Sequence, residues 1–169
     1  MRLYDIVNVE VDDNTAKLLG YAKLFKLGRD LKIAEAGRIG NFKQLVAYSG
    51  PLGNVLKGIR SPYVLGVEAK PDARIEEKVL SELGENGKLL ALDLGYLTIV
   101  PREKLPSALN ASSWLIKRAK HAKVGIAVAT FASSAENLLS SMQVVCILML
   151  LGLKQDEAKR ALGVWGDVL

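Results

Sequence analysis

The stretch that decides the fold is KLLALDLGYLTIVPREKLPSALNASSWLIKRAKHAKVGIAVATFA, residues 88–132. It places two continuous apolar runs on either side of a segment with helical periodicity. Continuous apolar runs are typical of strands buried on both faces, and their alternation with helices favours parallel pairing. The stretch therefore predicts a β-α-β unit, with strands at Lys88–Gly95 and Val124–Ala132 and a helix at Pro106–Lys123.

The same alternation continues on both sides of this unit. A strand at Tyr63–Ala69 leads into a helix that starts near Pro71, and a helix at Glu136–Leu151 follows the last strand. A short final helix begins near Gln155 and ends near Trp165. The second half of the chain is thus predicted to fold as β-α-β-α-β-α with a parallel sheet.

The first half alternates less regularly. Tyr4–Val11 is predicted as a strand, and a helix is predicted from about Asn14 to Gly28. Later apolar segments, such as Leu31–Gly37, are short and are joined by loops where helices would normally lie. A full barrel of eight β/α units usually needs about 250 residues. We therefore predict a single α/β domain, residues 1–169, folded as an abbreviated TIM-like (β/α) barrel with parallel strands and some helices replaced by loops.

The apolar run VVCILMLL, Val144–Leu151, is too short to span a bilayer, which takes about 20 apolar residues. The amino-terminal segment lacks the apolar core and cleavage site of a signal peptide. We therefore expect no membrane association and a cytoplasmic location. Cys146 is the only cysteine, which excludes an intrachain disulfide and a thiolate zinc site within the chain. Its apolar surroundings predict a small core residue.

The chain has a net charge of +5, and its positive charge is confined to two blocks. Residues 14–62 hold nine basic and two acidic residues, net +7, and residues 101–123 hold six basic and one acidic residue, net +5. Confined positive blocks are expected of a nucleic-acid-binding surface, and a solvated lysine surface is the alternative. Trp114 and Trp165 lie at apolar helical positions that predict core packing, so the sequence favours recognition of RNA backbone and shape.

Catalytic motifs of hydrolases are missing from the sequence. His121 is the only histidine, so a histidine-rich metal site cannot form, and its basic helical context predicts an exposed residue. No G-x-S-x-G, Walker or dinucleotide-binding motif occurs.

Glu68 and Asp93, at the ends of adjacent predicted strands, are the best carboxylate pair. Two interpretations stay open for them: oxygen ligands of a divalent cation, or partners of Lys70 or Arg38. The first interpretation gives the alternative function, a small metal-dependent β/α-barrel enzyme that acts on a phosphorylated metabolite.

The carboxyl-terminal part of the chain carries three successive segments, IAVATFASSAENL (126–138), VVCILMLLGL (144–153) and KQDEAKRAL (154–162). Together with the β-α-β unit before them, they resemble ribonuclease P protein component 3, the archaeal relative of the thirty-kilodalton eukaryotic subunit. The resemblance covers Lys88–Leu162. It departs from the family at the start of the apolar helix, where the family's Arg-Ser-Pro is replaced by Leu-Ser-Ser at residues 139–141.

The resemblance implies a β/α-barrel protein subunit of ribonuclease P, the ribonucleoprotein endonuclease that removes 5′ leaders from precursor tRNA. The RNA would carry the active site and its magnesium, so this chain would bind no cofactor and hold no catalytic residue. Its partners would be ribonuclease P RNA and a second small protein subunit, with precursor tRNA contacted indirectly. An assembly module that binds a protein instead of RNA is a third interpretation. The predicted RNA-binding residues come from the two basic blocks: Arg38, Lys43, Arg60, Arg102, Lys117, Arg118, Lys120 and Lys123.

Overall fold

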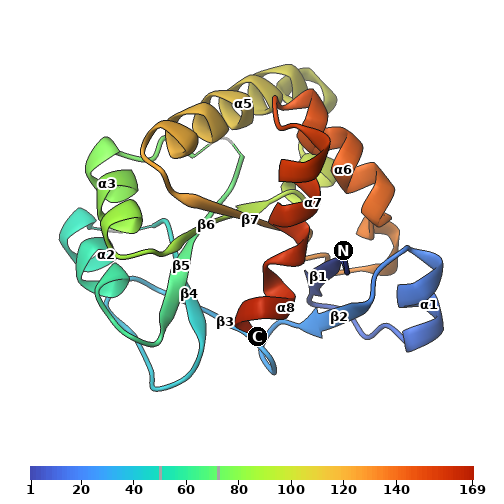
Figure 1. Ribbon diagram of the computed structural model, residues 1–169, viewed down its shortest axis with the longest axis horizontal. Coiled ribbons are helices and arrows are strands. Elements are labelled where there is room, and N and C mark those ends of the chain that lie inside the picture. Colours follow the sequence, from blue (N-terminus) through green and yellow to red (C-terminus); the bar gives the residue numbers. More distant parts are fainter. Residues whose placement is uncertain (50, 72) are drawn as a thin grey trace.

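The computed structural model describes residues 1–49, 51–71 and 73–169, and parallel strands alternate with helices along the chain (Figure 1). The strands are β1 (Tyr4–Val7), β2 (Lys23–Lys26), β3 (Lys32–Ala34), β4 (Gln44–Ala47), β5 (Val64–Ala69), β6 (Leu89–Asp93) and β7 (Gly125–Ala129). The α-helices are α1 (Asp13–Leu18), α2 (Leu52–Ile59), α3 (Glu77–Glu85), α4 (Tyr96–Ile99), α5 (Leu105–His121), α6 (Ser141–Leu150), α7 (Gln155–Gly163) and α8 (Trp165–Val168). Two 3-10 helices are η1 (Arg102–Lys104) and η2 (Ala135–Asn137). The alternation confirms the predicted α/β class.

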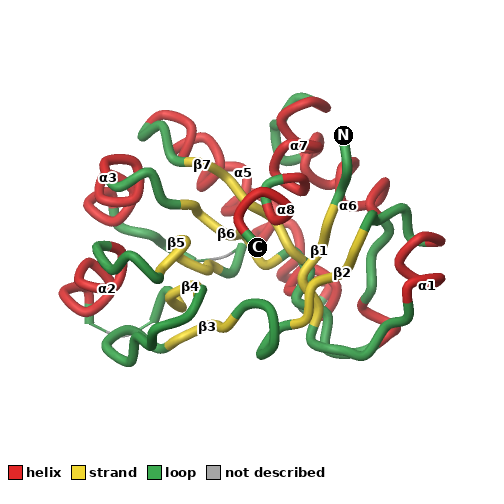
Figure 2. The backbone as a smooth tube through the Cα atoms, turned by 60° about the horizontal axis from the view of Figure 1, so that its bottom comes forward, coloured by secondary structure: helices red, strands yellow, loops and turns green. Residues whose placement is uncertain are grey.

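The strands form two parallel sheets, one of β1 and β2 and one in the order β3-β4-β5-β6-β7. A parallel bridge between Leu27 and Leu31 joins the sheets just beyond β2. At the opposite edge, the N–H of Phe131, beyond β7, donates to the carbonyl of Ile6 in β1 at 2.8 Å. Both edges of the larger sheet therefore contact the smaller sheet, and Figure 2 shows α2, α3 and α7 outside the strands.

Apolar side chains cover both faces of the strands. Outside the strands, Val67, Leu90 and Val128 pack against the apolar sides of α2, α3, α5, α6 and α7. This double burial is what the continuous apolar runs of β6 and β7 predict. Between the two sheets lies a second cluster, to which five strands and α8 contribute: Ile6, Phe25, Leu45, Ala91, Ala127, Ala129 and Trp165.

Trp165 anchors α8 to the strands. Its side chain is 0% exposed, and its indole N–H donates to the carbonyl of Val128 in β7 at 2.7 Å. Buried indole N–H groups usually find such a partner. The predicted core position of Trp165 is confirmed. The carboxyl-terminal residues are also tied to the strands, because the ammonium group of Lys43, just before β4, donates to the carbonyl of Val168.

The predicted helix from about Asn14 to Gly28 is wrong. α1 ends at Leu18, and the chain reverses at Gly20, whose positive φ of 81° few other residues adopt. The following residues form β2, which pairs with β1 and buries Phe25 between the sheets. The connections β2–β3 and β3–β4, both fully described, contain no helix, which confirms that loops replace helices in this half.

Other elements are shorter than predicted. β1 ends at Val7 instead of Val11, and α3 begins several residues after its predicted start. α6 begins at Ser141 instead of Glu136, because Ser140 caps it: the hydroxyl oxygen of Ser140 accepts the N–H of Gln143 at 3.3 Å.

Cys146 is exposed, so its predicted core position is wrong. α6 is apolar on all sides and buries one of them, with Leu148 in the core. Its outward side carries Cys146 together with exposed Met142, Met149 and Leu150. Among the described helices, none combines the length and the apolar character needed to cross a bilayer.

Candidate nucleic-acid interface

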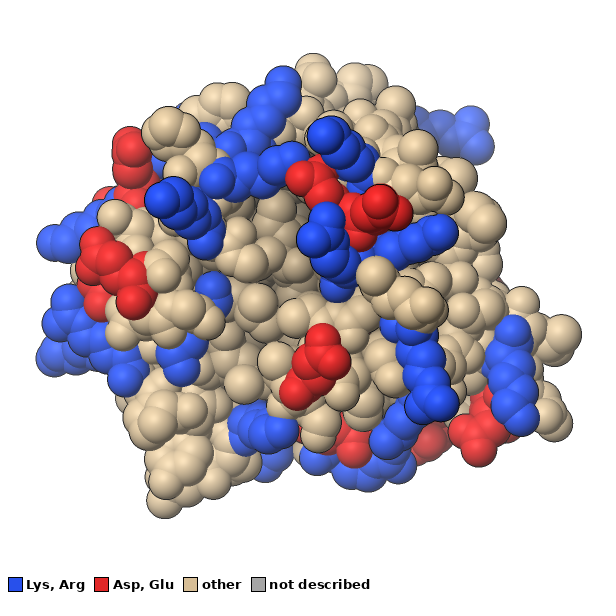
Figure 3. Space-filling view, in the orientation of Figure 1, with Lys and Arg blue, Asp and Glu red and all other residues tan. Residues whose placement is uncertain are grey.

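A basic residue lies within two residues of the amino end of six of the seven described strands, and Arg60, at the end of α2, precedes β5 by four residues. Because the strands are parallel, these residues gather at one end of the fold. Figure 3 shows Lys and Arg side chains around the margin of the face that carries α8, interspersed with fewer acidic ones. We call the following set the amino-end bases, in strand order: Arg2, Lys23, Lys32, Lys43, Arg60, Lys88 and Lys123.

Three buried or partly buried carboxyl groups lie toward the opposite, carboxyl end of the strands. Asp5, Glu68 and Asp93 lie in β1, β5 and β6 near this end, and burial raises the pKa of Asp5 to about 7. Burial, and then the nearby charge of Asp93, raises the pKa of Glu68 to about 7, while burial raises the pKa of Asp93 to about 6. Desolvation of the charged form is the dominant cause in each case. Carboxyl groups with such pKa values are partly protonated near neutral pH, so we infer phosphate binding from the basic residues gathered at the amino end.

The structure separates the eight predicted RNA-binding residues. Lys43, Arg60, Lys120 and Lys123 lie at or beside the amino ends of β4, β5 and β7. Arg38 lies instead beyond the carboxyl end of β3. The remaining three lie on η1 and along α5: Arg102, Lys117 and Arg118.

Three of the predicted residues already have acidic partners. Arg60 binds Glu82 of α3 through two nitrogens, at 2.7 and 3.0 Å. Lys120 binds Glu157 of α7 at 2.7 Å, and Arg38 binds its neighbour Glu35 at 3.2 Å. Such surface pairs contribute only about 0–1 kcal/mol, so phosphates can compete for these cations.

Other predicted residues are freely available. Within residues 1–49, 51–71 and 73–169, Arg102, Lys117 and Lys123 form no ion pair, and all three are exposed. Lys123 has a positive φ of 56°, so it turns the chain sharply between α5 and β7.

Four amino-end bases were missed from the sequence: Arg2, Lys23, Lys32 and Lys88. Lys32 and Lys88 stand at the starts of predicted strands, and counting bases at strand starts would have found them. Lys23 was hidden inside the wrongly predicted helix. Lys88 also has a structural task, because its ammonium group donates to the carbonyl of Val64 at 2.6 Å.

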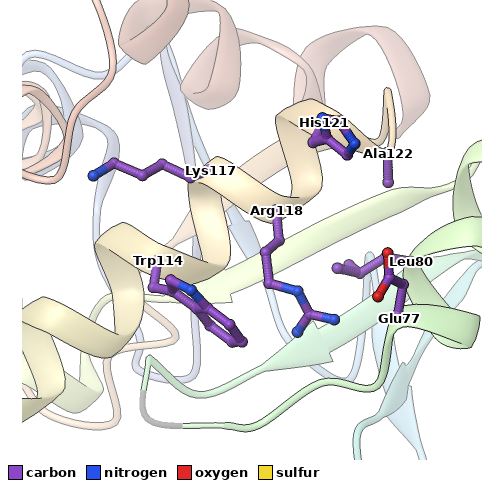
Figure 4. Close-up of a pocket in the computed structure, with 7 residues that line it drawn as sticks. All are labelled: Glu77, Leu80, Trp114, Lys117, Arg118, His121 and Ala122. Atoms are coloured by element: carbon purple, nitrogen blue, oxygen red, sulfur yellow. The ribbon is translucent and has the colours of Figure 1, made fainter.

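Trp114 is 56% exposed, so its predicted core position is wrong. α5 turns Leu115 and Ile116 into the core, which leaves Trp114 on the outer side between α5 and α3. The guanidinium carbon of Arg118 lies 4.5 Å from the centre of the indole ring (Figure 4). His121, one turn further along α5, is exposed as predicted.

Asp5 links β1 to the segment after β7. Its carboxylate accepts the N–H of Thr130 at 2.7 Å, the Thr130 hydroxyl at 2.6 Å and the N–H of Ile6 at 2.8 Å. This role was not predictable from the sequence, because the partner of Asp5 is more than one hundred residues away. Asp5 is therefore a structural residue of the junction between the two sheets.

Asp5→Asn is expected to weaken the pH dependence of stability. Because burial raises the pKa of Asp5 to about 7, the folded protein keeps a proton that the unfolded chain releases near pH 4. The free energy of unfolding therefore falls as pH rises from 4 to 7, by up to about 1.4 kcal/mol per pH unit from this group. Asparagine keeps the acceptor for the two N–H groups and donates to Thr130, but does not titrate.

Urea unfolding at several values between pH 4.5 and 7.5 measures this slope. Glu68 and Asp93 also have raised pKa values and still titrate in the variant. The dependence of stability on pH is therefore expected to become weaker in Asp5→Asn without disappearing. Asp12→Asn is the contrasting control, because hydrogen bonds from Thr15 hold the pKa of Asp12 below its usual range. An unchanged slope in Asp5→Asn would contradict the assignment.

The carboxylates do not form a metal centre in the described part of the chain: no three Asp, Glu, His or Cys side chains are placed to share an ion. The ammonium group of Lys70 lies 5.8 Å from the ring centre of Tyr96, and its charge lowers the pKa of both Glu68 and Asp93 against the effect of burial. Arg38 pairs with Glu35, so of the two predicted partners only Lys70 acts on the carboxylate pair.

Neither a known protein-family profile nor a curated protein sequence matches the chain. The resemblance to ribonuclease P protein component 3 therefore stays a prediction from the quoted segments, and the functional argument rests on the geometry of the surface.

Proposed function

We propose that this chain is a non-catalytic, RNA-binding protein subunit of ribonuclease P, which supports the catalytic RNA in removing 5′ leaders from precursor tRNA. One observation carries the proposal: six described strands have a basic residue within two residues of their amino ends, Arg60 precedes the seventh, and these residues share one end of the fold. A surface of this kind binds a phosphate backbone through several contacts without reading bases.

The proposed architecture is an abbreviated TIM-like barrel. Contacts at both edges of the larger sheet, at Leu27–Leu31 and at Phe131–Ile6, support closure of the strands around the apolar cluster that lies between the two sheets. Enzymes on such barrels place their active sites at the carboxyl ends of the strands. The amino-end bases lie at the other end, which suits a chain that contributes binding surface while RNA performs the chemistry.

The chain itself takes no part in bond breaking under this proposal. Magnesium would be bound by the partner RNA, and a second small protein subunit would complete the assembly; both follow from the resemblance. Lys117 and Lys123 are the predicted contacts with the greatest freedom to bind phosphate, while Arg102, equally exposed, follows the carboxyl end of β6. Arg60 and Lys120 would exchange carboxylate partners for phosphate oxygens, which is a modest rearrangement at exposed sites.

The salt dependence of RNA binding tests the proposal. The chain is expected to bind ribonuclease P RNA from its native cells, with an affinity that falls by about 10²- to 10³-fold between 50 and 200 mM salt if four to six phosphates are contacted. Filter binding at a series of salt concentrations gives the slope, and sequencing of RNA that copurifies with the tagged chain identifies the partner. Weak or salt-independent binding to that RNA would contradict the proposal.

A second candidate function is a metal-dependent enzyme that acts on a phosphorylated metabolite. It is favoured by the pKa values of Glu68 and Asp93, which burial raises to about 7 and 6, within the range useful for proton transfer. Neither residue lines any of the five cavities described in the structure. Hydrolysis of a phosphoester by the isolated chain, lost in Glu68→Gln, would favour this function over RNA binding.

A further inference from the structure

Trp114 stands at the centre of a groove between α3 and α5. Two cavities, of about 280 and 500 Å³, meet at its side chain and that of Arg118. Glu77 and His121 line the first cavity, and Arg74 lines the second. The volumes are those of small-ligand pockets, and an aromatic ring forms their shared wall.

The indole of Trp114 is contacted by Arg118 and is otherwise more than half exposed. Arg118 is fixed by a hydrogen bond from its guanidinium group to the carbonyl of Ile75, at 2.7 Å. In this position its guanidinium carbon lies 4.5 Å from the ring centre, a cation–π contact that holds the ring in one orientation. Since 56% of the tryptophan is exposed, its other surface can accept a second planar group.

The groove carries charges of both signs, with Arg74, Lys117 and Arg118 beside two glutamates. Glu76 and Glu77 line the two cavities and would repel a phosphate placed against them. Lys117 also lines the first cavity, and Figure 4 shows its side chain directed away from Arg118 and Glu77. A nucleotide would therefore place its base in the groove and its phosphate toward Lys117.

The groove leads to the amino-end bases. α5 rises about 1.5 Å per residue, so Trp114 lies about 10 Å along the helix axis from His121, the last residue of α5, and Lys123 follows two residues later. Lys117 and Lys120 occupy the turns between them. A strand whose phosphates contact Lys123 and Lys117 can thus reach Trp114 with a base.

We propose that Trp114, backed by Arg118, stacks an unpaired nucleobase of the bound RNA. This inference rests on the proposed function and adds a single-stranded contact to a surface that otherwise recognises backbone and shape. Base–aromatic stacking tolerates every base, because each has a π-face. The RNA partner must therefore present an unpaired nucleotide beside the RNA helix or loop whose phosphates contact the amino-end bases of the protein.

Binding of two RNA probes to three proteins tests the inference. The probes are a 12-nucleotide oligo(A) strand and a blunt 12-base-pair RNA duplex, and the proteins are the wild type, Trp114→Leu and Trp114→Phe. We expect Trp114→Leu to bind the single strand about tenfold more weakly, and Trp114→Phe to retain most of the affinity. Duplex binding and the salt slope are expected to stay unchanged, because no phosphate contact is removed.

Tryptophan fluorescence supplies a second readout. Trp165 is 0% exposed, so quenching by oligo(A) reports on Trp114 and is expected to vanish in Trp114→Leu. Equal single-strand affinity in the wild type and Trp114→Leu would overturn the inference while leaving the proposed function intact. Failure of the wild type to bind either RNA would overturn both. Quenching by a proline-rich peptide but not by oligo(A) would assign the groove to a protein and overturn the stacking role.

Discussion

Replacement of Lys32, Lys43 and Lys123 together by glutamine is expected to lower the affinity for ribonuclease P RNA by about 10²- to 10³-fold at 0.1 M salt. The three lysines stand at the amino ends of β3, β4 and β7, so Lys32 and Lys43 sample one edge of the larger sheet and Lys123 the other. Each lost phosphate contact removes about 0.7 to 0.9 from the slope of log K against log salt, so the slope is expected to fall by about two to three.

Arg38, Lys70 and Lys26 give a matched control, because they lie at or just beyond the carboxyl ends of β3, β5 and β2. The triple glutamine variant of these residues removes the same charge from the opposite end of the strands. If net charge alone attracts RNA, the two triple variants lose equal affinity. If the amino end is the binding surface, the control keeps most of the affinity and the wild-type slope. An equal loss in both variants would remove the basis of the proposed interface.

Arg38 is informative within this control, since it is the predicted RNA-binding residue that the structure places at the carboxyl end. Arg38→Gln alone is expected to change RNA affinity little. Arg38 and Lys43 are five residues apart in the sequence, but the loop between β3 and β4 carries them to opposite ends of parallel strands.

The second half of the fold was predictable because its local and long-range signals agree. The apolar runs of β6 and β7 suit only strands buried on both faces, and the intervening helix, α5, differs from its prediction by one or two residues at each end. In the first half the signals conflict. Lys23–Lys26 continues an apolar spacing that also fits a helix, and its strand structure depends on pairing with β1. Pairing partners of this kind are not visible in a local pattern.

The candidate site was predicted in part for the same reason. Lys123 and Lys120 could be placed because the end of α5 and the start of β7 were both well marked in the sequence. Lys23 was not predicted as a site residue, because β2 was predicted to be part of a helix. Trp114 and Trp165 occupy similar apolar helical positions, and only the packing of α5 on Leu115 and of α8 between the sheets decides which one is buried. Whether a large side chain beside the apolar side of a helix becomes buried depends on tertiary packing, which a local sequence pattern does not show.

Trp165→Ala is expected to lower the free energy of unfolding by about 3–5 kcal/mol. The side chain is 0% exposed and lies in the apolar cluster between the two sheets, so its removal opens a cavity between them. The Val128 carbonyl also loses the indole N–H that it accepts at 2.7 Å. For a domain whose total stability is about 5–15 kcal/mol, this loss takes up a large share of the folding free energy.

Urea unfolding of Trp165→Ala beside Trp114→Ala isolates the effect of burial, because the same atoms are removed from a buried and an exposed site. Trp114→Ala is expected to change stability by about 1 kcal/mol or less, since little apolar surface returns to water. Trp165→Phe keeps most of the volume but loses the hydrogen bond, so an intermediate loss is expected. A Trp165→Ala variant as stable as Trp114→Ala would mean that the Trp165 side chain does not hold α8 against the strands.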